Sequence, residues 1–173
     1  MWVFGYGSLM WDGWEAQHGC TRKERASLQG FRREFNKASR ENWGTSEQPG
    51  PTLGLTTDAA GICEGLVFEI PDAQQAAVEA YLKQREGPSF TLQLHDVNLQ
   101  SGISVRALVP VNDASKVTYI GGLSLPERAR MAKIAYGSSG ACSEYVKNIR
   151  EKLGELGIND SAVESFWSAV KSA

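Results

Sequence analysis

The chain has 173 residues and a formal net charge of −2, enough for one domain with a sizeable core and too few for two comfortable ones. Its Lys and Arg residues are scattered along the sequence, which argues against nucleic acid and against an anionic membrane surface as partners. No apolar stretch is long enough to span a bilayer, and no basic segment with a following apolar core marks a secretory leader.

The three cysteines, Cys20, Cys63 and Cys142, are odd in number and widely spaced. This usage is typical of reduced thiols and predicts a cytoplasmic protein without a disulfide framework. The two histidines, His18 and His95, are far apart, and only His18 has a cysteine at close spacing. Such a pair is common by chance, so we expect no metal site.

The first two-thirds of the chain read as strands and turns. An apolar run at residues 2–4 breaks into a glycine-bearing turn, as a short buried strand does. Further strands are expected at residues 28–35, 52–56, 62–70, 90–99 and 103–111. The stretch 42–51 is rich in Gly and Pro and predicts a loop, and Gln100-Ser101-Gly102 predicts the turn of a hairpin.

Helices follow the strands. Pro71-Asp72 with Gln75 resembles a capping box and predicts a helix that ends at Gly87-Pro88. Ser124-Leu125-Pro126-Glu127 is a second capping box, for a helix that runs to Tyr136. Apolar residues at helical spacing predict two more helices. One carries Tyr145, Val146, Ile149 and Leu153 and ends near Gly157, and the other runs from about Asp160 to Val170. Strands before helices indicate an α+β fold in a single domain, residues 1–173.

The loop Tyr6-Gly7-Ser8-Leu9 is the first candidate for chemistry. Its glycines let backbone N–H groups face a ligand without a side chain in the way, which suits a carboxylate or a developing oxyanion. The surrounding sequence lacks the third glycine and the long helix of a dinucleotide site. An ordinary turn is the competing interpretation.

Glu86 is the second candidate. It lies where a helix is expected to end, beside Gly87 and ahead of Phe90. The negative end of the helix macrodipole and apolar neighbours both raise the pKa of a carboxyl, which suits a proton shuttle. The competing interpretation is an exposed glutamate paired with Arg85 or Lys83.

Taken together, an ordered set of segments resembles the γ-glutamylcyclotransferase family, most closely its ChaC-like, glutathione-degrading branch. The set covers nearly the whole chain, and its order is more specific than any member alone. Its members are Tyr6-Gly7-Ser8-Leu9, Gly30-Phe31-Arg32-Arg33-Glu34-Phe35, Gly44-Thr45 to Pro49-Gly50, Cys63-Glu64-Gly65-Leu66-Val67, Tyr81-Leu82 with Arg85-Glu86, Tyr119-Ile120-Gly121-Gly122-Leu123-Ser124, and Gly137-Ser138-Ser139-Gly140 with Glu144-Tyr145.

The resemblance implies a small mixed, nearly closed β-barrel flanked by helices, and an enzyme that needs no cofactor. It implies that Tyr6, Gly7, Ser8 and Leu9 bind a small-molecule γ-glutamyl substrate and that Glu86 is the catalytic acid and base. Tyr145 matches a tyrosine of this branch that lines the pocket or packs in the core. The oligomeric state is left open.

Three departures from the branch pattern concern the leaving-group side of the substrate. They are Trp43 and Ser46 in place of Arg and Pro, Ser89-Phe90 in place of Gly-Tyr, and Cys142 in place of Asn. The sequence therefore predicts the γ-glutamyl part of the substrate more firmly than glutathione itself.

Three alternatives and one assignment stay open at this point. The alternatives are a cyclotransferase for another γ-glutamyl amine, a non-catalytic γ-glutamyl-binding module, and a hydrolase that uses Cys20 or Ser8 with a histidine. Arg33 and Arg40 are the two candidates for holding the substrate α-carboxylate.

Overall fold

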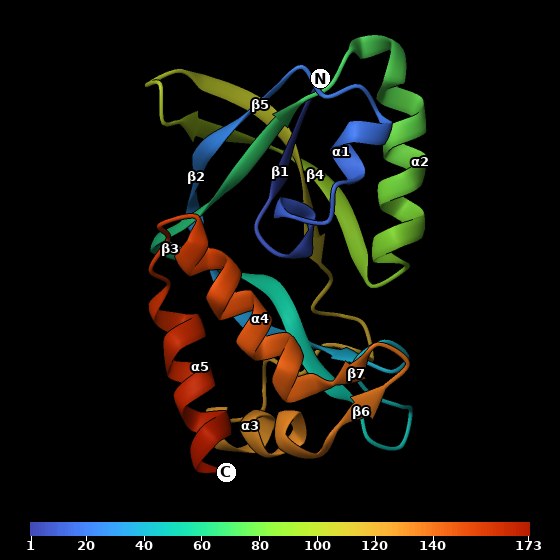
Figure 1. The fold of residues 1–173 in the computed structure, drawn as a ribbon, viewed down its shortest axis with the longest axis vertical. Helices are drawn as coiled ribbons and strands as arrows, with labels where there is room; N and C mark the ends of the chain where they lie inside the picture. The colour runs from blue at the N-terminus through green and yellow to red at the C-terminus, as the bar shows by residue number, and fades with distance from the viewer. The chain divides into compact units, whose positions relative to one another are not determined.

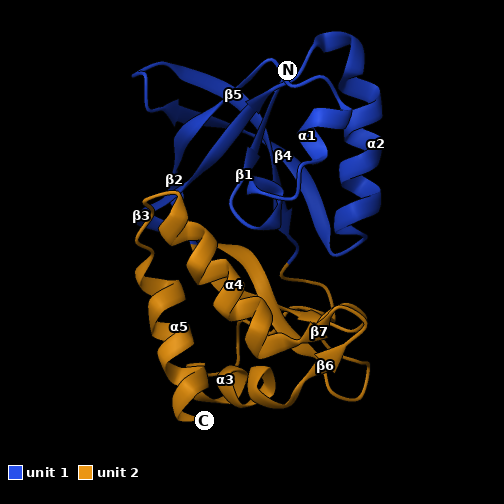
Figure 2. Cartoon of the chain, viewed as in Figure 1, with its two compact units in different colours: residues 1–32, 57–113 blue, residues 33–56, 114–173 orange.

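The computed structural model describes residues 1–173, which form two compact units (Figure 2). Unit 1 comprises residues 1–32 and 57–113, and unit 2 comprises residues 33–56 and 114–173. Each unit is built from two separate stretches of the chain. The single domain expected over residues 1–173 stays a prediction.

The sheet of unit 1 belongs to a closed barrel with the strand order β1-β3-β2-β4-β5, of which β2 and β3 continue into unit 2 (Figure 1). The strands are β1 (Trp2–Gly5), β2 (Arg22–Ser39), β3 (Gly50–Glu69), β4 (Phe90–Leu99) and β5 (Ser104–Asn112). The barrel is mixed, because β1 runs antiparallel to β3 but parallel to β5. The structure thus confirms the expected mixed barrel, and it shows the barrel closed rather than nearly closed.

Backbone pairing fixes the register of the barrel. Trp2 lies opposite Glu69 on one side of β1 and opposite Ala107 on the other. The expected β4–β5 hairpin is confirmed, with Phe90 opposite Asn112. The barrel strands carry many buried apolar side chains, of which Val3, Phe4, Val67, Phe68, Val97, Ala107 and Val109 are fully buried. Because successive residues of a strand face opposite sides of the sheet, these side chains pack on both faces of the barrel wall.

The two strands expected at residues 52–56 and 62–70 are one continuous strand, β3. The small and polar residues 57–61 between them are part of the strand and do not interrupt it. The strand expected at residues 28–35 is likewise only the middle of the longer β2. The predicted break between residues 56 and 62 was therefore wrong, and the predicted bounds of the strand at residues 28–35 were too narrow.

The remaining elements of unit 1 are short helices at the barrel and one longer helix. They are η1 (Ser8–Met10), α1 (Trp14–Gln17), η2 (Asp72–Gln74) and α2 (Gln75–Glu86). α1 lies beside α2 (Figure 1), where the rings of Trp14 and Tyr81 stack at 5.9 Å.

The predicted capping box at Asp72 is wrong. No side chain caps α2, which starts three residues later than Asp72, after η2. The Asp72 carboxylate instead accepts a 2.6 Å hydrogen bond from the ammonium group of Met1. This charge pair lowers the pKa of Asp72 and leaves the helix start without its side-chain cap.

Unit 2 contains the helices α3 (Leu125–Ile134), α4 (Cys142–Glu155) and α5 (Ser161–Ser172) and the two-stranded β6–β7 ribbon, Tyr136–Gly137 with Gly140–Ala141. The capping box at Ser124 and Glu127 is confirmed in both directions. α3 ends at Ile134 and not at Tyr136, because Tyr136 pairs with Ala141. No helix in the structure combines the length and the apolar character needed to cross a bilayer.

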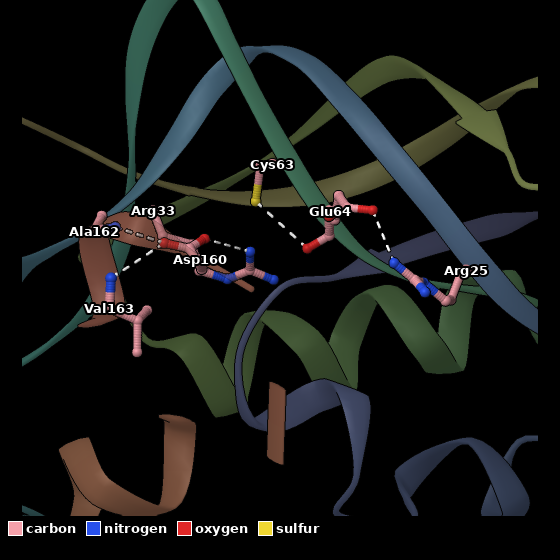
Figure 3. Close-up of polar contacts among 7 residues, drawn as sticks. All are labelled: Arg25, Arg33, Cys63, Glu64, Asp160, Ala162 and Val163. Carbon is pink, nitrogen blue, oxygen red and sulfur yellow. Dashed lines mark hydrogen bonds and ion pairs between the residues drawn. The ribbon is translucent and has the colours of Figure 1, made fainter. Parts of the chain in front are cut away.

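A buried ion pair connects β2 to α5 within unit 2 (Figure 3). The Arg33 side chain is fully buried, and its Nη1 donates to Asp160 Oδ2 at 2.9 Å. The other carboxylate oxygen of Asp160 accepts hydrogen bonds from the N–H groups of Ala162 and Val163, at 3.0 and 3.1 Å. Asp160 therefore neutralises a buried cation and caps α5 at once.

Close approach of β1 and β3 requires glycine at position 65. A methyl group there would meet the Gly5 carbonyl oxygen and, at 2.9 Å, the Phe4 ring. Because backbone cannot swing aside as a side chain can, we expect Gly65→Ala to destabilise the fold by about 1–3 kcal/mol. Urea denaturation measures this loss.

Gly154→Ala is the matched control, because position 154 in α4 faces open space and alanine favours a helix by up to about 1 kcal/mol. Equal stability of the Gly65→Ala variant and the unmodified chain would show that the two strands can separate without cost.

Candidate active site

The loop predicted from Tyr6 to Leu9 connects β1 to η1, and the two side chains at its ends anchor it. The buried Tyr6 donates its hydroxyl to the Pro110 carbonyl at 2.9 Å. Leu9 is buried, and its carbonyl accepts from the indole N–H of Trp14 at 3.0 Å. Of the four residues, Tyr6 and Leu9 are buried, Gly7 is half-buried and Ser8 is exposed.

Backbone donors face outward from the turn. The Met10 N–H donates to Gly7 O at 2.9 Å, and the Trp11 N–H donates to Ser8 O at 3.2 Å. As at any helix start, the N–H groups of Ser8 and Leu9 then have no acceptor within the turn itself. That these donors face a ligand, as the glycines led us to expect, stays a prediction.

Glu86 is the last residue of α2, as predicted, and Gly87 follows as the cap. Its side chain is 18% exposed, and Oε1 lies 3.7 Å from Nε of Arg85. The proposed pairing with Arg85 is thus present, but on a mostly buried carboxylate and not on an exposed one.

Arg85 connects the two predicted site elements. Its Nη2 donates to the Ser8 hydroxyl at 2.8 Å, while its Nε faces Glu86. One guanidinium therefore contacts both Glu86, its neighbour in sequence, and Ser8, which lies 77 positions away from Arg85. The sequence prediction that the loop and Glu86 share a site is supported by this geometry, although what binds there stays a prediction.

Sequence reasoning missed two partners of Arg85, namely Tyr81 and Asp12. The Tyr81 hydroxyl lies 2.9 Å from Arg85 Nη1, and Asp12 forms an ion pair with Nη2. Tyr81 precedes Arg85 by four residues, so helical spacing predicts this contact. Nothing local in the sequence points from Asp12 to α2.

Tyr145 lies in unit 2, on α4. Its hydroxyl accepts a hydrogen bond from the Leu53 N–H at 3.2 Å, and its ring lies 5.1 Å from the ring of Trp43 and 6.4 Å from that of Phe35. Tyr145 is only half-buried. These contacts describe packing within unit 2, and a role in substrate binding stays a prediction.

Two of the three departures from the branch pattern lie together in unit 2. Trp43 contacts Tyr145, and the Cys142 thiol donates to the Pro51 carbonyl at 3.3 Å. Burial raises the pKa of Cys142 to about 12. This thiol is therefore neutral at physiological pH and serves as a small apolar side chain.

The two arginines considered for the substrate α-carboxylate differ in environment. Arg33 is buried in its ion pair with Asp160, so binding a second carboxylate would require breaking that pair. Arg40 is exposed. The structure thus favours neither as a ready-made carboxylate clamp.

The hydrolase alternative finds little support in the geometry. The Ser8 hydroxyl accepts from Arg85, which holds it without withdrawing its proton. The Cys20 thiol donates to the Arg22 carbonyl at 3.1 Å, and burial raises its pKa. His18 packs its ring against Trp14 and Tyr81. Neither nucleophile has an activating histidine among these contacts.

Metal-ligating side chains do not gather elsewhere: no group of three His, Cys, Asp or Glu residues is arranged to hold an ion. One hollow of about 200 Å³ lies beside the Arg25–Glu64 ion pair of unit 1 (Figure 3). None of the predicted site residues lines it. Its two charged groups are satisfied by each other at 2.9 Å.

A closed mixed barrel thus carries a polar loop and a carboxylate at a helix end, and both contact Arg85. The ChaC-like protein family model matches residues 1–173. The chain therefore belongs to the ChaC-like family.

Curated relatives and solved structures agree with this assignment. Gamma-glutamylcyclotransferase 2-3 of Arabidopsis thaliana is 29% identical over 181 residues, 99% of this chain and 88% of the plant protein. The glutathione-specific gamma-glutamylcyclotransferase of Escherichia coli K12 is 27% identical over 174 residues, 99% of this chain and 73% of that protein. The crystal structure of the glutathione-specific yeast enzyme has a TM-score of 0.87 at 22% identity, covering 99% of this chain and 98% of that one. The likeness to the yeast structure confirms the predicted fold.

Proposed function

We propose that this protein is a γ-glutamylcyclotransferase that converts glutathione to 5-oxoproline and Cys-Gly. The observation that carries the proposal is that Arg85 contacts both Ser8 of the loop and Glu86. The chain in which this occurs belongs to the ChaC-like family. Relatives whose names state the glutathione-specific activity support the choice of substrate.

The reaction is intramolecular. The α-amine of the substrate attacks its own γ-carbonyl carbon, and a new C–N bond closes a five-membered lactam. The amide bond to cysteine then breaks, and its nitrogen leaves as the free amine of Cys-Gly. Nucleophile and electrophile belong to one molecule, so the enzyme supplies geometry and proton transfer, and no metal or redox cofactor enters the scheme.

Glu86 moves the proton in this scheme. As a carboxylate it takes a proton from the substrate ammonium group, because only the neutral amine attacks. It returns that proton to the departing nitrogen. It then takes the second proton, which the ring nitrogen loses as the lactam forms, and passes it to the released amine, so Cys-Gly leaves with an ammonium group and the enzyme ends in the state in which it began. Acid–base help of this kind contributes about 10²–10⁴ in rate.

Backbone donors of the loop bind the developing oxyanion in this scheme. The N–H groups of Ser8 and Leu9, which have no acceptor within the η1 turn, would face the γ-carbonyl oxygen. The loss of one such donor costs roughly 3–4 kcal/mol in transition-state stabilisation. Tyr6 anchors the loop through its hydroxyl group, and Gly7 lies at the bend of the loop.

We also place the protein in the cytoplasm. All three cysteines are free thiols in the structure, a state that fits a reducing compartment.

The experiment that tests the function is incubation of the purified chain with glutathione, followed by detection of 5-oxoproline and Cys-Gly. γ-Glutamyl-alanine serves as the comparison substrate, and a parallel reaction contains EDTA. We expect stoichiometric release of both products from glutathione, a lower kcat/KM for γ-glutamyl-alanine, and no effect of EDTA.

Other outcomes identify the alternatives. Faster turnover of γ-glutamyl-alanine would indicate a cyclotransferase for another amine. Glutathione binding without release of 5-oxoproline would indicate a binding module and overturn the proposal. Release of free glutamate, rather than 5-oxoproline, would indicate a hydrolase.

A further inference from the structure

The Arg85 guanidinium contacts groups from three separate parts of unit 1. Nη1 donates to the Tyr81 hydroxyl at 2.9 Å, and Nη2 donates to the Ser8 hydroxyl at 2.8 Å. Nη2 also forms an ion pair with Asp12, and Nε faces Glu86 at 3.7 Å. The side chain is 24% exposed, so the planar fork of donors is largely committed to these four groups.

Arg85 stays cationic throughout the working pH range. Burial lowers its pKa, but the hydrogen bond to Tyr81 and the charges of Asp12, Tyr81 and Glu86 outweigh burial and raise the pKa above its ordinary value. Two carboxylates therefore face one fixed positive charge. A lysine could supply the charge but not the planar fork that engages several partners at once.

The contacts of Arg85 belong to a closed ring of interactions around the loop. Tyr81, which accepts from Arg85, stacks on Trp14 with an interplanar angle of 13°. Trp14 in turn donates its indole N–H to the Leu9 carbonyl. Arg85 thus holds Ser8, and Trp14 holds Leu9. Tyr81 contacts both Arg85 and Trp14.

We propose that Arg85 is a positioning residue that sets the Ser8–Leu9 backbone donors at a fixed distance from the Glu86 carboxylate. The proposal rests on the proposed function for its kinetic part. Its role is to hold and not to transfer a proton, because a permanently charged guanidinium is a poor acid or base at neutral pH. Asp12 and Tyr81 fix the guanidinium, which in turn fixes the loop and the acid.

The kinetic test compares Arg85→Gln and Arg85→Lys with Lys83→Gln, which removes the same charge from an exposed position on the same helix. We expect Arg85→Gln to lower kcat about 10²-fold, since a misplacement of about 1 Å has that effect, while KM changes by less than about threefold. Arg85→Lys should recover part of the loss because it keeps the charge. Lys83→Gln should match the unmodified chain.

A second measurement is independent of activity. Hydrogen–deuterium exchange of residues 6–12 should be at least about fivefold faster in Arg85→Gln than in Lys83→Gln, with exchange in unit 2 unchanged. If the unmodified chain releases no 5-oxoproline, the proposed function fails, and the exchange data alone decide whether Arg85 holds the loop.

Two results would overturn the positioning role. One is unchanged exchange at residues 6–12 in Arg85→Gln. The other is faster exchange throughout the chain with an unchanged kcat per folded molecule, because this would show that Arg85 contributes to general stability and not to the placement of the loop.

Discussion

Glu86→Gln is expected to fold and bind substrate like the unmodified chain but to lose turnover almost completely. Glutamine keeps the size and the hydrogen-bonding ability of the side chain but cannot accept a proton from the substrate ammonium group. We expect kcat to fall by about 10²–10⁴, the usual contribution of a positioned acid and base. Release of 5-oxoproline under saturating glutathione measures kcat, and calorimetric titration measures binding.

Glu79→Gln is the matched control for this prediction. Glu79 is on the same helix, with a side chain 32% exposed and a 3.7 Å ion pair to Lys83, and it makes no contact with the loop in the structure. Removing its charge should leave kcat unchanged. If Glu86→Gln keeps more than about a tenth of the turnover, proton transfer must occur through another group, because a true shuttle contributes far more.

Asp160→Ala is expected to cause the largest loss of stability, about 3–5 kcal/mol, because it removes the ion-pair partner of a buried arginine. The Arg33 side chain has no exposed surface, whereas that of Asp160 is 12% exposed. The substitution also removes the acceptor that caps α5 at Ala162 and Val163. Urea denaturation, followed by circular dichroism, measures the change in the free energy of unfolding.

The two contributions of Asp160 can be separated with Asp160→Asn. Asparagine keeps a side-chain oxygen for the cap, so this variant should recover about 1 kcal/mol relative to alanine, while the buried guanidinium still lacks its counter-charge. A loss below about 1 kcal/mol in Asp160→Ala would contradict the prediction, since it would show that water or another group replaces the carboxylate without cost.

Local signals in the sequence predicted their elements well. Ser124 and Glu127 cap α3 because both halves of the box are three residues apart and need no distant partner. The same signal failed at Asp72, where the pairing of β1 with β3 brings the Met1 ammonium group to the carboxylate. A full positive charge competes successfully with backbone N–H groups for that oxygen.

The missed continuity of β3 has a similar physical reason. Gly61 reads as a break in a strand pattern, but a methyl group at this position would lie 2.8 Å from the Phe31 carbonyl oxygen. The glycine therefore allows two neighbouring strands to approach closely and does not end one of them. Such a contact depends on the partner strand, which the local sequence does not reveal.

The candidate site shows the same difference between features with a local sequence signal and features that depend on distant residues. Glu86 and the glycine-bearing loop were predicted because each carries its own local signature, a helix end and a strand-to-turn transition. The guanidinium that joins them was named only as a charge partner, and Asp12 was missed, because ion pairs across long sequence separations leave no periodic trace. The shared contact of loop and acid with Arg85 was accessible only from the structure.

The arrangement of β1 has a consequence for synthesis on the ribosome. Residues 2–5 are made well before their partners, which are residues 66–69 in β3 and 107–108 in β5. β1 therefore cannot pair fully on its β3 side before residue 69 has been made, nor on its β5 side before residue 108. Such delayed, non-local pairing slows folding and leaves apolar surface exposed to solvent. Chaperone binding early in translation is therefore expected to raise the yield of native protein.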